Sequence, residues 1–455
     1  MSDHLPQDVL IDIFARLPTD TLVRLTSVCK SWYSVIASPK FVSHHLNRNA
    51  DDRLLLVRHR TDKPKTDHYS LALDGIDSLR LLKALDLPFD SVGYSIVGSV
   101  NGVICLSDDL EYGCMDDMFL WNPSIKKFLA LPKYNVTVHS HGSFSHCLGF
   151  GFDPVTNDFK VVRVVHPGCD RIPPLVELYT HKTGRWRYIS ERALPMMVTE
   201  RCQQAYVNGA ANWMAFHRGP FRNTILSFNM SEEVFSKTLV PESITNDGCG
   251  MILVVFKESL CLIQQCVYGA EPHCVVWIMK EYGVPTSWSR LFRIELSGGL
   301  RRPLGLRENG EVIFATRDGN LVSCDHRSRC ITYLGVRGTL CDAFYADAYT
   351  ESLELLKKLE SPENLVVKKS NSTEEEGKLK EAERLGMLNM LESPENPVVG
   401  GQKKKKNKNN KEEQEKEGAR RISYGGTERE LDNGVSGLVE GAEDYALKPR
   451  AWFAR

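Results

Sequence analysis

Long apolar runs and net charge are what this sequence lacks. Its 57 Lys and Arg nearly balance its 58 Asp and Glu, for a formal net charge of −1, so no global field favours nucleic acid or a membrane surface as a partner. No uninterrupted apolar run approaches the roughly 20 residues of a bilayer-spanning helix, and the few residues before Leu5 are too short for a targeting peptide. We therefore expect no nucleic-acid or membrane partner, and a cytoplasmic or nuclear protein.

Catalytic and metal-binding motifs are missing as well. The 13 cysteines contain no C-x-x-C pair, and scattered thiols in a reducing compartment act as small buried apolar groups. There is no phosphate-binding loop, dinucleotide fingerprint, nucleophile elbow or H-E-x-x-H helix. The acidic stretch 108–117 lacks the alternating ligands of a calcium loop. One Ser/Gly-containing stretch, better explained as loop than as metal site, carries His139, His141, His146 and Cys147. We expect no enzymatic activity, cofactor or metal.

The N-terminal forty-odd residues have the spacing of short amphipathic helices. Apolar residues recur at steps of three and four over Val9–Leu17, the period of a helix with one apolar face. Pro6 suits a first helical turn and Pro18 ends the helix, because proline has no N–H to donate. A second periodic run covers Leu22–Ile36. Such a small unit buries too little surface to be comfortable alone, so it is either a helical cap or a docking module.

This stretch resembles an F-box, the helical motif that binds the Skp adaptor of cullin–RING ubiquitin ligases. The VCKSW run is the form typical of plant F-box proteins. The likeness is carried by Leu5-Pro6, Asp8-Val9-Leu10, Ile13-Phe14, Leu17-Pro18 and Val28-Cys29-Lys30-Ser31-Trp32. The resemblance implies an adaptor-binding set of Leu5, Pro6, Val9, Leu10, Ile13, Leu17 and Pro18. It also implies that the helices are braced against each other by Val28, Cys29 and Trp32.

From about residue 97 the sequence repeats a turn followed by a strand. Steps of 56, 51, 49 and 52 residues separate the turn residues Asn101, Asn157, Asn208, Lys257 and Asn309. Asn-Gly between apolar runs is a strong hairpin signal, because both residues tolerate a positive φ. About four short strands per period predict a β-propeller blade rather than a sandwich. Five blades are expected, and a sixth if strands within 53–73 and from Ala343 to Tyr349 close the ring.

The repeats loosely resemble the plant F-box-associated or kelch-like interaction domain. The segments closest to it are Phe150–Val162 and Trp121-Asn122-Pro123. The double-glycine strand of kelch repeats is absent, so we expect an irregular propeller. The resemblance implies a mainly β chain with a small α-helical N-terminal module. The boundaries expected are 1–47 for the F-box, 48–356 for a propeller of five to six blades, and 357–455 for a tail.

The tail changes in composition. Aromatic residues are absent between Tyr349 and Tyr424 while Lys, Glu and Asn increase, so most of it is expected to be disordered. The run Lys403–Lys408 is either a nuclear-import patch or a solvated charge run. Neither reading gives the tail a chemistry of its own.

Together the two resemblances imply the substrate-recognition subunit of an SCF-type ubiquitin ligase. The F-box would bind a Skp-type adaptor, and through it the cullin–RING ligase, while the propeller binds an unknown target protein for ubiquitination and degradation. Two alternatives stay open. One is a binding protein whose F-box acts outside ubiquitination, and the other is a propeller enzyme, which needs convergent carboxylates or metal ligands on one face of the propeller.

Overall fold

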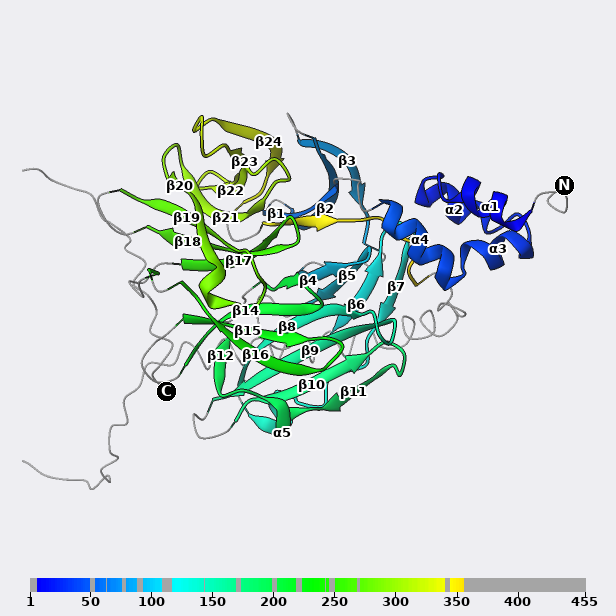
Figure 1. Cartoon of the computed structure of the whole chain (residues 1–455), viewed down its shortest axis with the longest axis horizontal. Coiled ribbons are helices and arrows are strands. Elements are labelled where there is room, and N and C mark those ends of the chain that lie inside the picture. Colours follow the sequence, from blue (N-terminus) through cyan, green and yellow to red (C-terminus); the bar gives the residue numbers. More distant parts are fainter. Residues whose placement is uncertain are drawn as a thin grey trace, which may run out of the picture. The chain divides into compact units, whose positions relative to one another are not determined.

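The computed structural model describes residues 6–49, 54–62, 64–75, 79–87, 93–108, 117–142, 144–168, 173–198, 203–217, 223–241, 243–244, 250–267, 271–339 and 344–355. In this part of the chain a helical N-terminal module is followed by six antiparallel sheets (Figure 1). The fold is mainly β, as predicted, and none of its described helices is long and apolar enough to cross a membrane. The predicted tail, 357–455, and residues 109–116 of the acidic stretch lie outside the described residues.

The N-terminal module consists of α1 (Gln7–Phe14), α2 (Thr19–Leu25), α3 (Lys30–Ile36) and α4 (Pro39–Asn49). Pro6 and Pro18 stand directly before α1 and α2, where a missing N–H leaves no helical hydrogen bond unmade. Phe14 is fully buried at the centre of the module. Its ring lies 5.1 Å from that of Trp32 and 6.4 Å from that of Phe41, edge-to-face in both cases. One aromatic side chain therefore joins α1, α3 and α4.

The six sheets are the blades of a propeller. Blade 1 contains β4 (Ser95–Val100), β5 (Val103–Ser107), β6 (Met118–Asn122) and β7 (Lys127–Ala130). Blade 2 contains β8 (Phe144–Asp153), β9 (Asp158–Pro167), β10 (Leu175–Thr180) and β11 (Arg185–Tyr188). Blade 3 contains β12 (Met196–Val198), β13 (Ala205–Val207), β14 (Ala210–His217), β15 (Asn223–Asn229) and β16 (Val234–Leu239). Blade 4 contains β17 (Gly250–Phe256), β18 (Ser259–Cys266), β19 (His273–Met279) and β20 (Trp288–Glu295). Blade 5 contains β21 (Leu300–Leu306), β22 (Val312–Thr316), β23 (Asn320–Cys324) and β24 (Ile331–Arg337).

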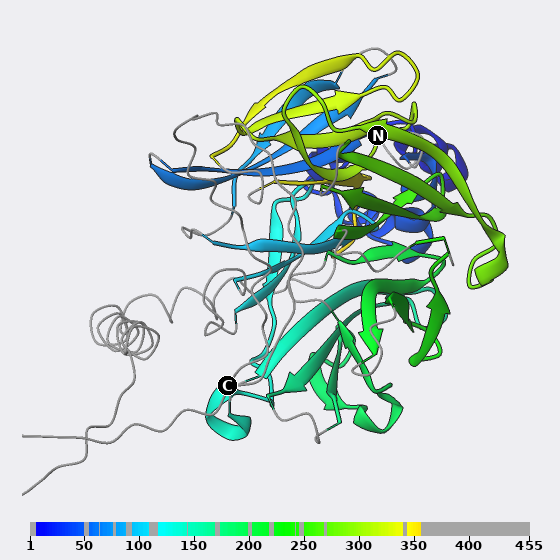
Figure 2. The ribbon, with the colours of Figure 1, turned by 90° about the vertical axis from the view of Figure 1, so that its left-hand side faces the viewer.

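The sixth blade combines the two ends of the propeller sequence. It contains β25 (Tyr345–Tyr349), β1 (Leu54–Asp62), β2 (Lys65–Asp74) and β3 (Leu79–Leu85). β25 pairs antiparallel with β1, from Leu54 opposite Tyr349 to Arg58 opposite Tyr345. Figure 2 shows the blue strands of this blade beside the yellow strands of blade 5. The predicted ring closure is confirmed, and the blade number, left open between five and six, is six.

The predicted turns join the first two strands of blades 1, 2, 4 and 5, and in blade 3 the turn joins β13 to β14. Glycine supplies the left-handed backbone in blade 5, where Gly310 has φ 88°. Asparagine, which tolerates that region, supplies it with φ of 50°, 51° and 52° at Asn101, Asn157 and Asn208. The blade 4 turn contains neither glycine nor asparagine. Its residues Lys257 and Glu258 nevertheless adopt the left-handed backbone, with φ of 47° and 62°.

The Phe150–Val162 segment forms the contact between blade 2 and blade 3. The Gln204 side chain accepts a hydrogen bond from the Phe150 amide (2.8 Å) and donates one to the Phe150 carbonyl (2.7 Å). The Tyr206 hydroxyl donates to the Phe152 carbonyl at 2.7 Å. Since β8 is an edge strand of its sheet, these side chains satisfy backbone groups that would otherwise be unpaired.

A buried lysine strengthens the same contact. Lys160 is 3% exposed, and its Nζ donates to Asp153 (2.8 Å), Glu233 (2.9 Å) and the Met230 carbonyl (2.7 Å). Burial opposes ionisation of Asp153, but hydrogen bonds from Lys160 and Ser231 hold the pKa of its carboxyl well below the usual range. Removal of one partner would leave a buried charge uncompensated, so the charge network fixes how these blades meet.

The chain does not leave the propeller at the end of β25. The next residues, Thr350–Leu355, are called the closing segment here. The Asn122 side chain donates to the carbonyls of Ser352 (3.1 Å) and Glu354 (3.0 Å). Both leucines of the segment are buried in one apolar cluster with residues of the helical module and of blades 1 and 2. The Trp121-Asn122-Pro123 motif therefore holds the end of the propeller sequence against its first blade.

Replacing Gly102 by alanine should destabilise the protein more than the same change at Gly209. Both glycines follow asparagine in equivalent turns, with φ of 74° and 72°, so a strain of about 1 kcal/mol is common to both variants. A Cβ at Gly102 would lie 2.5 Å from Ser352 Oγ and 2.7 Å from the Thr350 carbonyl oxygen, whereas nothing lies within 4 Å at Gly209. We expect the melting temperature of Gly102→Ala to be several degrees lower; equal values would show that the closing segment does not pack on this turn.

Candidate functional site

Two surfaces are candidates for function: an apolar face of the helical module and a cavity at the centre of the propeller. On α1, Val9 and Ile13 are 43% and 44% exposed. With Pro6, which is also exposed, they recur at steps of three and four and project from one side of the helix. This face is called the α1 apolar face. Pro18 is exposed and Leu17 is half-buried.

Two further residues of the predicted pattern have an unexpected degree of burial. Leu10 is only 7% exposed and packs in the core with Phe14, so it does not belong to the α1 apolar face. Val28 does not brace the helices, since it is 58% exposed. Trp32 does contact Phe14, and its backbone amide donates to the Cys29 sulfur. Adaptor binding stays a prediction for Leu5, which lies outside the described residues, for the buried Leu10, and for Pro6, Val9, Ile13, Leu17 and Pro18.

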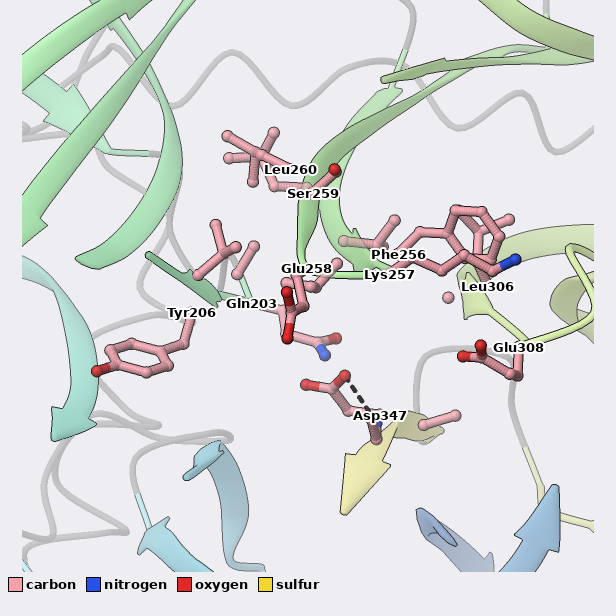
Figure 3. Close-up of a pocket in the computed structure, with 18 of the residues that line it drawn as sticks. Gln203, Tyr206, Phe256, Lys257, Glu258, Ser259, Leu260, Leu306, Glu308 and Asp347 are labelled. Atoms are coloured by element: carbon pink, nitrogen blue, oxygen red, sulfur yellow. Dashed lines mark hydrogen bonds between the residues drawn. The ribbon is translucent and has the colours of Figure 1, made fainter. Parts of the chain in front are cut away.

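A cavity of about 960 Å³ is lined by residues of blades 3 to 6, among them residues of β13, β17, β21 and β25. Part of its lining is apolar, from side chains that include Tyr206, Phe256, Leu260 and Leu306. Figure 3 shows Glu258, from the turn between β17 and β18, and Asp347, from β25, pointing into one space, with Gln203 beside them and Glu308 facing the same side. The cavity therefore combines apolar walls with convergent carboxylates, which is the usual composition of a binding pocket.

The carboxylates of this cavity differ in their partners. Asp74 is paired with Arg307, whose Nε lies 2.7 Å from Asp74 Oδ1. Across the residues that the structure describes, Glu258, Glu308 and Asp347 form no ion pair. The lining also contains lysines, at Lys257 and Lys280. The three unpaired carboxylates are called the channel acids.

Asp347 is the channel acid with the most unusual environment. Burial raises its pKa to about 6 from an ordinary 3.8. Two donors oppose this effect, the Ala348 amide at 2.8 Å and the Tyr345 hydroxyl at 3.3 Å from the carboxylate oxygens. Neither donor carries a full charge, so the two hydrogen bonds lower the pKa less than burial raises it. None of the channel acids was predicted, because each is a single acidic residue beside a turn or strand with no motif around it.

The histidine-rich stretch and the cysteines are the candidates for a metal site. No three His, Cys, Asp or Glu side chains among the described residues are placed to hold a metal ion. His146 and Cys147 are neighbours on β8 and so point to opposite faces of the sheet. Free cysteines are buried in the sheets at Cys105, Cys147, Cys261, Cys274 and Cys324, and burial raises the pKa of Cys261 to about 12.

Comparison with known proteins matches both parts of the chain. Residues 2–49 match the F-box-like family and residues 54–337 match the F-box associated beta propeller domain. F-box protein At3g07870 of Arabidopsis thaliana is 30% identical over 68% of this chain and 75% of its own length. F-box protein CPR1 of the same plant is 27% identical over 77% of this chain and 89% of its own length.

A third relative, the F-box/kelch-repeat protein At3g23880 of Arabidopsis thaliana, is 27% identical over 70% of this chain and 86% of its own length. Solved structures are far more distant. An exo-beta-1,3-galactanase from Clostridium thermocellum aligns with 54% of this chain and 61% of its own, at 9% identity and a TM-score of 0.34. A likeness this weak supports no inference about fold or activity.

Asp347→Asn should raise the melting temperature near pH 7.5 but leave it almost unchanged near pH 4. Because the folded-state pKa is about 6 against an ordinary 3.8, ionisation begins to cost folding free energy as the pH rises above 3.8. The whole cost is present above pH 6. Asparagine is neutral throughout and keeps an acceptor for the Ala348 amide. Scanning fluorimetry across this range measures the gain. Asp318→Asn, at an exposed carboxylate in a blade 5 turn, is the control; a gain independent of pH would exclude ionisation as its cause.

Proposed function

Because the chain belongs to the family of F-box proteins that carry an F-box associated β-propeller domain, we propose that it is the substrate-recognition subunit of an SCF-type ubiquitin ligase. Its F-box binds a Skp-type adaptor, which connects it to a cullin–RING ligase. Its propeller binds a target protein for ubiquitination and degradation. The observation that carries this proposal is the α1 apolar face, which stays exposed although the module has an aromatic core of its own.

Adaptor binding follows from apolar burial. Val9 and Ile13 are almost half exposed, and covering two such side chains contributes on the order of 2–3 kcal/mol. Pro6 adds a rigid apolar group at the start of the same face. The buried Phe14 beneath it keeps the helices in place, so little ordering is needed when the adaptor docks.

The propeller contributes positioning to a reaction that takes place elsewhere. Its blades 2 and 3 are joined by buried hydrogen bonds and charges, such as those of Gln204 and Lys160, which make it a stiff support for loops. A target held on it has a high effective concentration near the ubiquitin-loading machinery. The proposed site of action is the cytoplasm, the nucleus or both, in keeping with the absence of disulfides among the described cysteines.

A propeller enzyme is the second candidate, since Glu258 and Asp347 face one cavity and the pKa of Asp347 is raised. Paired carboxylates with separated pKa values are used in glycoside hydrolysis. Against this, Glu258 stands on an exposed turn, where bulk water reaches it, and F-box proteins act as adaptors. We expect no hydrolysis of a panel of nitrophenyl glycosides; hydrolysis abolished by Asp347→Asn would support the enzyme.

Introducing two charges on the α1 apolar face should abolish adaptor binding. In Val9→Asp combined with Ile13→Asp, two carboxylates would have to be buried at the interface without partners. We expect binding at least about 100-fold weaker, which corresponds to roughly 2.7 kcal/mol. Surface plasmon resonance with immobilised adaptor measures it, and an unchanged circular dichroism spectrum shows that the fold is kept.

The control is Val155→Asp, since Val155 is 82% exposed in a blade 2 turn and its change adds one such carboxylate away from the helical module. Undiminished binding by the double variant would contradict docking through α1. Reconstituted ubiquitination then separates the remaining alternative. If the wild-type chain binds the adaptor but no ubiquitin is transferred to the chain or to captured proteins, the F-box acts outside ubiquitination.

A further inference from the structure

The cavity at the propeller centre lies where several blades present their first turns. Its lining includes Asn208 of the blade 3 turn, Lys257 and Glu258 of the blade 4 turn, and Glu308 at the blade 5 turn. The closing strand adds Asp347 from blade 6. A group entering this cavity would therefore meet four blades at once, which gives it more contact than any single loop offers.

The lining of the cavity contains more acidic side chains than basic ones. The channel acids, Glu258, Glu308 and Asp347, have no ion-pair partner in the part of the chain that the structure describes. Lys257 does not neutralise them through a salt bridge; its Nζ lies over the Phe256 ring, 5.2 Å from the ring centroid. Lys280, the other lysine of the lining, forms no ion pair among the described residues either. The space is thus complementary to a cation with an apolar stem.

The protein keeps this arrangement at a cost to its own stability. Glu258 is held at φ 62° beside Lys257 at φ 47°, a left-handed backbone that costs a side-chain-bearing residue free energy. The equivalent turns of blades 1 and 3 use Asn-Gly instead, at 101–102 and 208–209. Burial of Asp347 disfavours its charged form. Strain and disfavoured charge that meet in one pocket are typical of a binding site.

We propose that the channel acids recognise a lysine or arginine side chain of the target protein, inserted into the central cavity. The proposal rests on the proposed function and specifies the chemistry by which the propeller selects its target. The aliphatic stem of the inserted residue would lie against the apolar walls, such as Leu260 and Leu306, while its charged head meets the carboxylates. A metal ion is not the expected occupant, because the described acids are not grouped closely enough to hold one.

The test uses the full-length chain bound to its adaptor. The probes are four immobilised pools of random peptides, each with one fixed central residue: lysine, arginine, glutamine or glutamate. We expect the lysine and arginine pools to retain at least tenfold more protein than the glutamate pool. The triple variant Glu258→Gln, Glu308→Gln, Asp347→Asn should lose this preference. Equal retention by all pools, or a preference that the triple variant keeps, would overturn the proposal.

Two controls make the result specific. Glu232→Gln removes an exposed carboxylate from a blade 3 turn outside the cavity and should leave the cationic preference unchanged; a loss equal to that of the triple variant would mean that general surface charge is responsible. Adaptor binding is measured on the same samples. If adaptor binding holds while the peptide preference is absent, only this inference fails, whereas a wild-type chain that does not bind the adaptor contradicts the proposed function itself.

Discussion

The pairing of β25 with β1 is the interaction on which the rest of the structure depends. A propeller becomes a closed ring only when its last blade is complete, and here five residue pairs from Leu54–Tyr349 to Arg58–Tyr345 complete it. The two strands are almost 300 residues apart in the sequence, so bringing them together costs conformational entropy. The pairing of β25 with β1 offsets part of that cost. The closing segment then extends the pairing, because Asn122 of blade 1 holds the carbonyls of Ser352 and Glu354.

Closure also determines where the candidate cavity forms. Asp347 is a residue of the closing strand itself, so the acid with the raised pKa enters the central cavity only when the ring is complete. Glu258 and Glu308 come from turns of blades 4 and 5, which are brought beside Asp347 by the same event. The cavity is therefore a property of the assembled ring, which brings these like charges together although their mutual repulsion is greatest at short distance.

The helical module differs from the propeller, because its core is formed by residues that are close together in the sequence. Phe14 contacts Trp32 and Phe41 within fewer than thirty residues of sequence, and this aromatic core leaves Val9 and Ile13 unused on the outside. An exposed apolar face is unfavourable for an isolated chain and favourable for one that docks. The helical module and the propeller thus offer two separate candidate surfaces, one apolar and one acidic, which is what the proposed role of joining a ligase to its target requires.

Local patterns in the sequence determined the elements. The helical spacing of Val9–Leu17, the asparagine turns and the period near fifty predicted the helices, the blades and the two strands that close the ring, because each depends on neighbouring residues alone. Tertiary structure decided which apolar positions are buried: Leu10 and Val9 are equally apolar, yet only Leu10 meets Phe14, and Val28 faces solvent. It also created the channel acids, since Glu258, Glu308 and Asp347 come from three blades and carry no motif. Short-range periodicity encodes secondary structure, whereas convergence of distant side chains is encoded only by the closed ring.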